Sequence, residues 1–527
     1  MAQPAFYQGI ADSMTAESSF DAIIIGSGAA GLTAALTAAR AGLRTLVLEC
    51  TELIGGTSAM SGGLVYAPGS PLAAGSGYQL DRAGVTGYLE AVARRPIDQA
   101  LLEAFLDGAP RMVQELIDAG VALRLTGVAD YYRNVPGAAV GHVIAVQPFD
   151  PAPLGELAAR IRRSPYRECA APWTAGTGLV AALVGACLRA GVRIRTASRV
   201  TRLLMAENAV TGVAIDSAEG PRSVRAGHVV LASGGYEFNQ ALTREWLGER
   251  LEGTWSCPGN QGDGLVMATS AGARLSAMGE AQWYALLRLS DDRLEGFPLF
   301  ADASPARNLP GSIVVDSSGR RFANEGGLYQ DFGRALASHA PGRRPAWLVM
   351  DAAFVAAYRQ TCFGDRPLTP PHWFTANTPG ELAALIGVEP EALVQTLQRF
   401  NEPAASGLDP QFGRGENDVD REWGDSAKNG AYASLAPLER GPFHATRVYA
   451  GCSGTTGGPK VDAAARVVDT AGAPIPGLYA AGNVTAQLLG DTAPASGATL
   501  GPGMTFGYLA GCTAAAAARY LPDAIRA

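Results

Sequence analysis

The chain has few of the residues and segments that mark several large protein classes. Its five histidines and seven cysteines show no spacing typical of a metal site, a haem attachment site or a disulfide framework, so we expect no metal. No run of about eighteen apolar residues is present, and we therefore expect no integral membrane segment. The net charge of −7 comes without any basic tract, which argues against nucleic acid or an anionic membrane as a partner.

The first nineteen residues also lack the basic segment that opens a secretory signal peptide, and we expect them to form a loose extension. Widely spaced cysteines are typical of reduced thiols, so the cytoplasm is the expected compartment. Apolar residues, by contrast, are plentiful, since 47% of the chain is hydrophobic against 17% charged, which suffices for a large core. A chain of 527 residues exceeds the usual size of one core, and we expect at least two domains.

The clearest pattern is a strand–turn–helix–strand unit near the N-terminus. Residues 21–25 and 45–48 read as buried strands and residues 32–41 as a helix. The turn between them, Gly26-Ser27-Gly28-Ala29-Ala30-Gly31, has the G-x-G-x-x-G pattern, whose glycines allow a tight bend, the approach of a pyrophosphate and close helix packing. Glu49 ends the second strand, where its carboxylate can accept hydrogen bonds from a ribose. The unit therefore predicts a dinucleotide-binding fold.

Three further segments favour FAD over NAD. Small residues and hydroxyls follow the acidic residue at 53–63, and they suit close contact with a flavin, which NAD does not need. The segments 230–235 and 478–483 are strands that end in small residues, as required where the chain passes an adenosine and a ribityl chain. The expected FAD-binding residues are Gly26, Ser27, Gly28, Ala30, Gly31, Glu49, Thr57, Ser58, Ser61, Gly62, Gly63, Val200, Ala232, Gly234, Gly482, Asn483, Thr499 and Leu500.

The middle of the chain differs in composition from its two ends. Residues 287–444 hold more Pro, Trp and Phe, and the Gly- and Ala-rich style returns afterwards. We predict an α/β fold in which residues 1–286 and 445–527 form a Rossmann-like FAD-binding domain and residues 287–444 an inserted α+β substrate domain. Residues 84–123 are expected to be helical, with Gly120 as a break, and a final helix is expected over about 502–520.

Three motifs carry a resemblance to a known family. The segment Gly497-Ala-Thr-Leu-Gly-Pro-Gly-Met-Thr-Phe-Gly-Tyr508 is very similar to the C-terminal signature of 3-oxosteroid Δ1-dehydrogenases, and the segments 129–132 and 321–332 also match. From residue 20 to about 515 the chain resembles the flavoprotein superfamily that contains these enzymes and the fumarate reductases. The resemblance implies Tyr329 as the base at the α carbon of a ketone, Tyr131 as its supporting tyrosine and Gly497 as the residue whose N–H polarises the ketone oxygen.

Desaturation beside a ketone makes three physical demands. A donor must acidify the α C–H through the carbonyl oxygen, a base must stand at the α carbon, and the flavin must face the β carbon. A tyrosine has an ordinary pKa of about 10, so Tyr329 needs a neighbouring phenol or a helix dipole to act as a base at neutral pH.

Two positions separate the alternatives within this superfamily. Fumarate reductases carry an arginine where Tyr329 stands, and a histidine in a motif that here reads Gly454-Thr-Thr-Gly-Gly458, so the resemblance favours ketone desaturation. Ala493 stands where the steroid family has a tyrosine that binds the ketone oxygen. We predict an FAD-dependent dehydrogenase that introduces a C=C bond α,β to the ketone of a cyclic substrate, either a 3-oxosteroid or a smaller ring such as an oxocyclohexane derivative. The alternatives are a fumarate-reductase-type ene-reductase and a catalytically silent flavin-binding homologue, while the electron acceptor and the oligomeric state stay open.

Overall fold

The computed structural model describes residues 19–167, 170–217, 220, 222–339 and 341–519. Apart from Ser19, the expected N-terminal extension lies outside these residues. No helix in the described ranges combines the length and the hydropathy that a membrane crossing needs.

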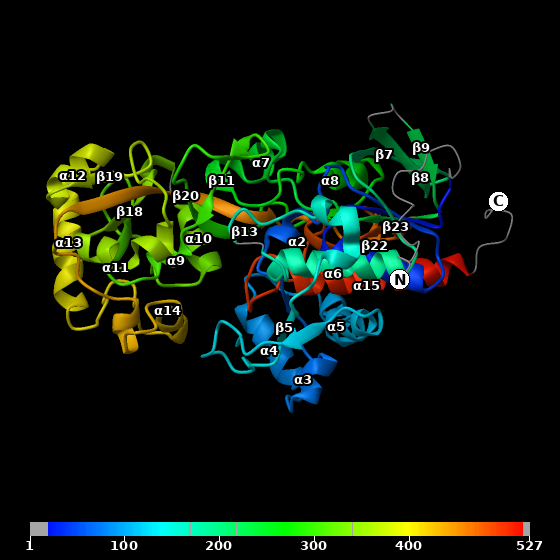
Figure 1. Cartoon of the computed structure of the whole chain (residues 1–527), viewed down its shortest axis with the longest axis horizontal. Helices are drawn as coiled ribbons and strands as arrows, with labels where there is room; N and C mark the ends of the chain where they lie inside the picture. Colours follow the sequence, from blue (N-terminus) through cyan, green and yellow to red (C-terminus); the bar gives the residue numbers. More distant parts are fainter. Residues whose placement is uncertain (1–18, 168–169, 218–219, 221, 340, 520–527) are drawn as a thin grey trace. The chain divides into compact units, whose positions relative to one another are not determined.

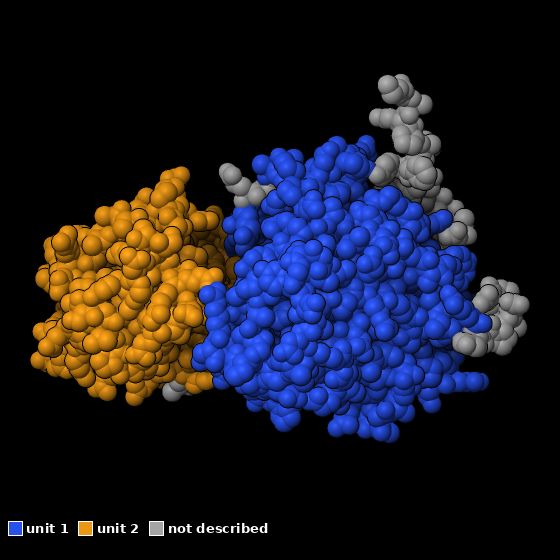
Figure 2. All heavy atoms as spheres, turned by 90° about the horizontal axis from the view of Figure 1, so that it is seen from below, with its two compact units in different colours: residues 1–242, 259–281, 454–527 blue, residues 243–258, 282–453 orange. Residues whose placement is uncertain are grey.

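The chain forms two compact units, which Figure 2 colours blue and orange. Unit 1 contains the residues up to Leu242, Gly259–Ala281 and the residues from Gly454 onward, and unit 2 contains Thr243–Pro258 and Gln282–Ser453. Unit 2 is thus inserted into the sequence of unit 1, and the range 287–444 lies inside it. The role of unit 2 as a substrate domain stays a prediction.

Unit 1 is built on a six-stranded sheet in the order β22-β23-β10-β1-β2-β6. Figure 1 labels the first two of these strands, β22 and β23. The strands from β23 to β6 are parallel to their neighbours, and β22 is antiparallel to β23. Every residue of β1, β2 and β10 is buried, as a parallel sheet covered on both faces requires, and this confirms the expected Rossmann-like α/β fold. The bounds are Arg466–Val468 (β22), Pro474–Ala480 (β23), His228–Leu231 (β10), Ala22–Ile25 (β1), Thr45–Leu48 (β2) and Arg193–Arg195 (β6).

Helix α1 (Ala29–Arg40) packs against both α6 (Ala175–Arg189) and α15 (Leu500–Ala518). The crossing of α1 and α15 requires glycine, because a Cβ at Gly507 would lie 2.3 Å from the carbonyl oxygen of Ala30. Helix α15 is therefore held against α1, beside the glycine turn at which α1 begins.

The region 84–123, which is expected to be helical, contains two helices separated by residues 93–98. Helix α4 (Arg82–Val92) ends before Pro96, whose ring disfavours a helical residue in front of it, and α5 (Gln99–Asp118) begins after it. Asp98 caps α5 by accepting a hydrogen bond from the N–H of Leu101 at 3.4 Å. Gly120, expected as a break, ends the helical region with a φ of +80°.

Two small antiparallel sheets, β3-β5-β4 and β7-β8-β9, complete the sheets of unit 1 that bear on its site. The segment 224–232 is divided between β9 and β10, which belong to different sheets. The bounds are Leu64–Tyr66 (β3), Leu123–Leu125 (β4), Val143–Val146 (β5), Ser198–Ala206 (β7), Ala209–Ser217 (β8) and Arg222–Arg225 (β9).

Unit 2 contains a mixed sheet in the order β16-β13-β20-β18-β17, and β11 and β19 also pair with β20. Two helices, α12 (Pro379–Ile386) and α13 (Pro390–Ala404), share a core with β17 and β18. The bounds are Gly253–Thr254 (β11), Ala281–Leu287 (β13), Ala301–Asp302 (β16), Ser312–Val315 (β17), Ala346–Met350 (β18), Phe374–Ala376 (β19), Phe443–Thr455 (β20), Ser304–Arg307 (α9), Tyr329–Ser338 (α10), Ala352–Phe363 (α11) and Asp418–Glu422 (α14).

Candidate active site

The glycine turn of unit 1 has the geometry of a dinucleotide cradle. Gly26 has a φ of +105°, and a Cβ there would lie 2.4 Å from the carbonyl oxygen of Ala232. A Cβ at Gly31 would lie 2.2 Å from the carbonyl oxygen of Gly26, so helix and turn touch through glycine. At Gly28, by contrast, a Cβ would meet nothing closer than the hydroxyl of Ser58 at 3.4 Å. The open side of Gly28 fits the approach of a pyrophosphate to the backbone.

The N-terminus of α1 is arranged to receive an anion. Gly28 stands at the N-cap position and offers no side chain to the N–H groups of the first turn. The N–H of Ala29 donates to the hydroxyl of Ser58 at 3.0 Å, which fixes that residue of α2 (Gly56–Met60) beside the turn. A helix start with free N–H groups and a partial positive charge is a ready site for phosphate.

Glu49 is fixed beside this turn. Its side chain is buried, and one carboxylate oxygen accepts from the N–H and the hydroxyl of Ser27 at 3.2 and 2.6 Å. The other oxygen accepts from the N–H and the hydroxyl of Thr51 at 2.9 and 3.0 Å. A bound ribose would have to share or replace one of these four hydrogen bonds. The N–H of Ser198, at the start of β7, donates to the carbonyl oxygen of Glu49 at 2.8 Å, which places the strand that carries Val200 next to the acid.

The loop after α2 is held against the start of α6. The hydroxyl of Ser61 donates to the carbonyl oxygen of Ser58 at 2.7 Å and accepts from the N–H of Gly63 at 3.1 Å. Gly63 has a φ of +66°, and a Cβ there would lie 2.2 Å from the backbone of Ala175. Gly62 lies between these two fixed residues, so this small-residue loop has a defined backbone.

The remaining predicted contacts come from the carboxyl ends of the parallel strands and from the start of α15. Gly234 follows β10 with a φ of +77°, and the side chain of Asn260 that lies against it donates to the hydroxyl of Thr57 at 3.0 Å. A Cβ at Gly482, after β23, would lie 3.2 Å from the side chain of Ala30. Asn483 follows Gly482, and Thr499 and Leu500 stand at the N-cap and first positions of α15. Carboxyl ends of parallel strands meet at one edge of a sheet, where ligands of this fold class bind.

A second group of predicted residues lies where the loop before α15 meets the segment around Tyr131. The hydroxyl of Tyr131 lies 2.7 Å from the hydroxyl of Ser496, and the N–H of Tyr131 donates to the carbonyl oxygen of Pro494 at 2.8 Å. Gly497 has a φ of +83°, and a Cβ there would lie 2.5 Å from the carbonyl oxygen of Leu64. The structure therefore brings Tyr131 and Gly497 together through Ser496, a residue that no sequence motif marks.

Tyr88 holds the same loop from α4. Its hydroxyl donates to the carbonyl oxygen of Pro494 at 2.6 Å and accepts from the N–H of Tyr132 at 3.3 Å. Burial raises the pKa of Tyr88 far above its ordinary value, so the phenol stays neutral and keeps its role as a donor. Beside it, the buried carboxylate of Asp130 bonds the Nδ1 atom of His142 at 2.9 Å. No sequence motif marked Tyr88 or His142. The partners of Tyr88 lie 44 and 406 positions away in the chain, and Asp130 lies 12 positions before His142.

Tyr329 lies in unit 2 as the first residue of α10. Its ring is stacked on Tyr284 at 4.2 Å between centroids and is parallel to Trp423 at 6.0 Å. Trp255 in turn packs on Tyr284 at 4.9 Å. The start of a helix favours a negative charge, and the stacked rings define the plane of the Tyr329 phenol.

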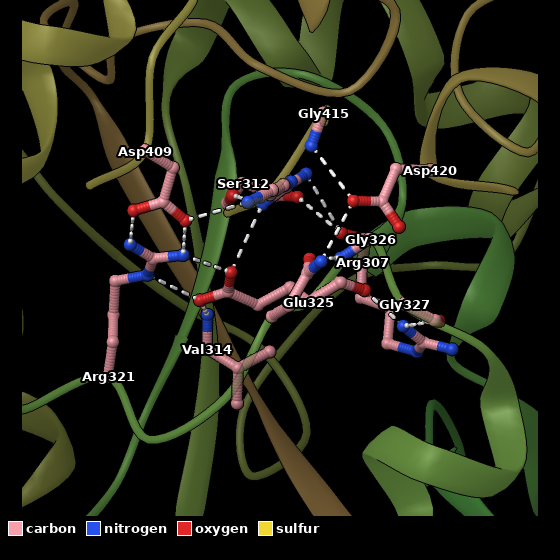
Figure 3. Close-up of polar contacts among 12 residues, drawn as sticks. Arg307, Ser312, Val314, Arg321, Glu325, Gly326, Gly327, Asp409, Gly415 and Asp420 are labelled. Carbon is pink, nitrogen blue, oxygen red and sulfur yellow. Dashed lines mark hydrogen bonds and ion pairs between the residues drawn. The ribbon is translucent and has the colours of Figure 1, made fainter. Parts of the chain in front are cut away.

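The segment before Tyr329 is anchored by a buried ion cluster centred on Glu325 (Figure 3). Arg321 donates to the two carboxylate oxygens of Glu325 at 2.7 and 2.6 Å, and the guanidinium of Arg414 lies 3.5 Å away. Arg321 also donates to both carboxylate oxygens of Asp409, at 2.9 and 2.8 Å. Burial by itself raises the pKa of Glu325, but the charge and hydrogen bonds of Arg321 outweigh it and hold this pKa below its ordinary value.

The same cluster fixes the backbone between Glu325 and Tyr329. Arg307 is completely buried and donates to the carbonyl oxygens of Glu325 and, at 2.9 Å, of Gly327. The side chain of Asn324 donates to the carboxylate of Asp420 at 2.8 Å. The turn that leads into α10 is therefore tied down at several points by charged groups from other parts of unit 2.

Comparison with known proteins indicates the family and the cofactor of this chain. Residues 21–500 match the family model described as FAD binding domain. The chain is 38% identical to the 4-oxocyclohexanecarboxylate 2-dehydrogenase of Sinomonas cyclohexanicum, over 97% of this chain and 95% of that protein. It is 33% identical to a 3-oxosteroid 1-dehydrogenase of Mycolicibacterium smegmatis, over 95% of this chain and 98% of that protein.

Among solved structures, the fold matches the 3-ketosteroid delta1-dehydrogenase of Sterolibacterium denitrificans in complex with 1,4-androstadiene-3,17-dione. The TM-score is 0.86 at 31% identity, over 95% of this chain and 100% of that chain. These matches confirm the resemblance seen in the sequence, and FAD is the cofactor that the glycine turn and the strand ends fit. The chain belongs to the FAD-binding family that includes the 3-oxosteroid and 4-oxocyclohexanecarboxylate dehydrogenases, and it is an FAD-dependent oxidoreductase.

Proposed function

We propose that this protein desaturates a cyclic ketone at the α,β position, with an oxocyclohexane carboxylate as its preferred substrate class rather than a 3-oxosteroid. The observation that carries the proposal is the site at Gly497. Within the described chain its N–H donates to no acceptor, although its backbone is fixed by the N–H of Gly501, which donates to its carbonyl oxygen at 2.8 Å. A fixed, unused N–H beside the start of α15 is suited to hold the oxygen of a ketone.

The choice of a small ring rests on Ala493 and on the relatives. Ala493 has a buried methyl side chain without a polar group, so this position presents no side-chain donor to a ligand. The steroid family has a tyrosine there, which makes a 3-oxosteroid the less favoured substrate. The 38% identical relative acts, by its name, on 4-oxocyclohexanecarboxylate, a ring without the steroid skeleton.

Each proposed residue has one task in the reaction. The N–H of Gly497 polarises the ketone and makes the α C–H more acidic. The phenolate of Tyr329 takes the proton from the α carbon, and its position at the start of α10 favours the ionised form. Bound FAD supplies the acceptor for the hydride that leaves the β carbon, and a separate electron acceptor completes the turnover.

The segment Gly454-Thr-Thr-Gly-Gly458 supports desaturation over reduction of an unsaturated acid. Thr455 accepts from the N–H of Tyr236 at 2.9 Å, and Thr456 donates to the carbonyl oxygen of Gly490 at 2.9 Å. Both hydroxyls thus serve the fold of unit 1, and the segment holds no cation that would bind a carboxylate.

Turnover with an artificial electron acceptor tests the proposal. We expect 4-oxocyclohexanecarboxylate to lose two hydrogen atoms and to yield a ring with a C=C bond beside the ketone, and a 3-oxosteroid to react more slowly. A steroid turned over faster than the small ring would overturn the substrate class, and inertness toward every cyclic ketone would overturn the reaction.

A further inference from the structure

The loop before α15 lacks the phenol of the steroid family but presents another hydroxyl close by. Ala493 and Ala495 are buried, whereas Ser496, directly before Gly497, is partly exposed. The hydroxyl of Ser496 lies 2.7 Å from the hydroxyl of Tyr131. The hydroxyls of Tyr131 and Ser496 are therefore neighbours, and the N–H of Gly497 belongs to the next residue along the chain.

The position of this hydroxyl is set by a rigid loop. The carbonyl oxygen of Pro494 accepts from the hydroxyl of Tyr88 and from the N–H of Tyr131, at 2.6 and 2.8 Å. Asp491, at the beginning of the loop, is buried and bonded to Arg95 at 3.1 Å. With the residues before Ser496 fixed, its side chain is oriented before any substrate binds, and such preorganised donors are the effective ones in catalysis.

The geometry of the bond between the two hydroxyls allows either one to be the donor. A phenol is a stronger acid than an alcohol, which favours Tyr131 as the donor and leaves the serine hydrogen to point elsewhere. A hydroxyl that accepts one hydrogen bond becomes a better donor in the next, because the chain of bonds polarises each member. Ser496 and Gly497 are consecutive residues, so the hydroxyl of one and the N–H of the other can reach the same oxygen atom.

We propose that Ser496 is a catalytic residue that replaces the missing phenol: its hydroxyl donates to the ketone oxygen of the substrate beside the N–H of Gly497. Tyr131 then acts as a positioning residue that orients and polarises Ser496. The inference rests on the proposed desaturation of a cyclic ketone. No bond is made or broken at Ser496, whose hydrogen bond strengthens as negative charge grows on the ketone oxygen during loss of the α proton.

Three variants of the FAD-loaded enzyme test the proposal. We expect Ser496→Ala to lower kcat/KM for the saturated ketone about 100-fold to 1000-fold, the usual effect of losing one oxyanion donor. Ser496→Thr keeps the hydroxyl and should stay within about tenfold of the wild type. Ser76→Ala removes an exposed hydroxyl of unit 1 far from this loop in sequence and serves as the matched control.

Binding of a planar enol mimic supplies a second readout. A phenol such as 4-hydroxybenzoate places an oxygen on a flat ring, as an enolate of the substrate does. Its Kd, followed by the change in the flavin spectrum, should rise in Ser496→Ala by a factor similar to the loss in kcat/KM, and Tyr131→Phe should raise it less. If Ser496→Ala does not retain FAD, Ser496→Cys, with nearly the same volume and a weak donor, takes its place.

The outcomes separate this inference from the function on which it rests. A Ser496→Ala enzyme with FAD bound, wild-type kcat/KM and unchanged affinity for the phenol would overturn the role of Ser496 while the function stands. Equal losses in Ser496→Thr and Ser496→Ala would overturn it as well. A wild-type enzyme inert toward all cyclic ketones would overturn the proposed function itself.

Discussion

Replacing Glu325 by glutamine tests whether the buried ion cluster stabilises unit 2. Glu325 and Arg414 are completely buried, and Arg321 is nearly so, so none of these charges is screened by water. The substitution keeps the volume of the side chain but removes its charge. The new amide group also places its own N–H donors in front of the guanidinium of Arg321, where the carboxylate accepted at 2.6 and 2.7 Å.

The expected loss of stability is large for a change of one atom. Removing one partner of a buried ion pair costs about 3–5 kcal/mol, because the other charge is left without compensation. Asp409 still binds Arg321 through both of its oxygens, so we place the loss at the lower end, about 3 kcal/mol in the free energy of unfolding.

Tryptophan fluorescence during urea unfolding measures this loss. Six of the seven tryptophans belong to unit 2 and Trp173 alone to unit 1, so the signal reports mainly on unit 2. Glu402→Gln, at an exposed position of α13, is the control and should change stability by less than about 1 kcal/mol. If Glu325→Gln also changes the free energy of unfolding by less than about 1 kcal/mol, the argument that its loss leaves a buried charge uncompensated is refuted.

Three more changes follow from the same structure. Tyr329→Phe should lower kcat by at least about 100-fold with FAD still bound, as expected for loss of a general base, and unchanged turnover would exclude that role. Gly28→Ala should weaken FAD binding with little effect on the stability of the apoprotein. Gly26→Ala should impair folding, because its Cβ would lie 2.4 Å from a backbone oxygen. Equal stability of the two apoproteins would contradict this difference. Burial favours the neutral forms of Glu325 and Asp409, but Arg321 outweighs it and holds the pKa of each below the ordinary 4.5 and 3.8. The contribution of these two carboxylates to stability is thus complete above about pH 4.5 and is lost as the pH falls through their lowered pKa values. The urea concentration at the midpoint of unfolding should therefore drop on acidification, and it should drop less steeply in Glu325→Gln.

The geometry of the glycine turn and the placement of Glu49 beside it were largely predictable, because their signals are local. Gly26, Gly28 and Gly31 stand between a buried strand and a helix, and each glycine has the steric reason that the pattern implies. Strand β2 and its terminal Glu49 follow at once in the sequence, so short-range hydrophobic patterns sufficed to place the acid beside the turn.

The surroundings of the predicted catalytic residues were less predictable, because they depend on long-range contacts. Tyr131 meets Ser496 across 365 positions, and Arg321 meets Asp409 across 88, so no spacing in the sequence announces either pair. The polar residues that gather around Glu325 are also unremarkable one by one, since Arg and Asp are usually solvated. Pro96, in contrast, is a visible signal, and its effect on the residue before it separates α4 from α5 within the helical region expected over 84–123.

Anaerobic titration of the FAD-loaded enzyme with a saturated cyclic ketone tests the central claim most directly. We expect 4-oxocyclohexanecarboxylate to abolish the visible absorbance of the oxidised flavin. We also expect one molecule of product, with a C=C bond beside the ketone, for each FAD that is reduced. The contrary result has two parts: the flavin stays oxidised with every cyclic ketone and, once it has been reduced chemically, an unsaturated acid reoxidises it. This result would contradict the claim and identify an ene-reductase instead.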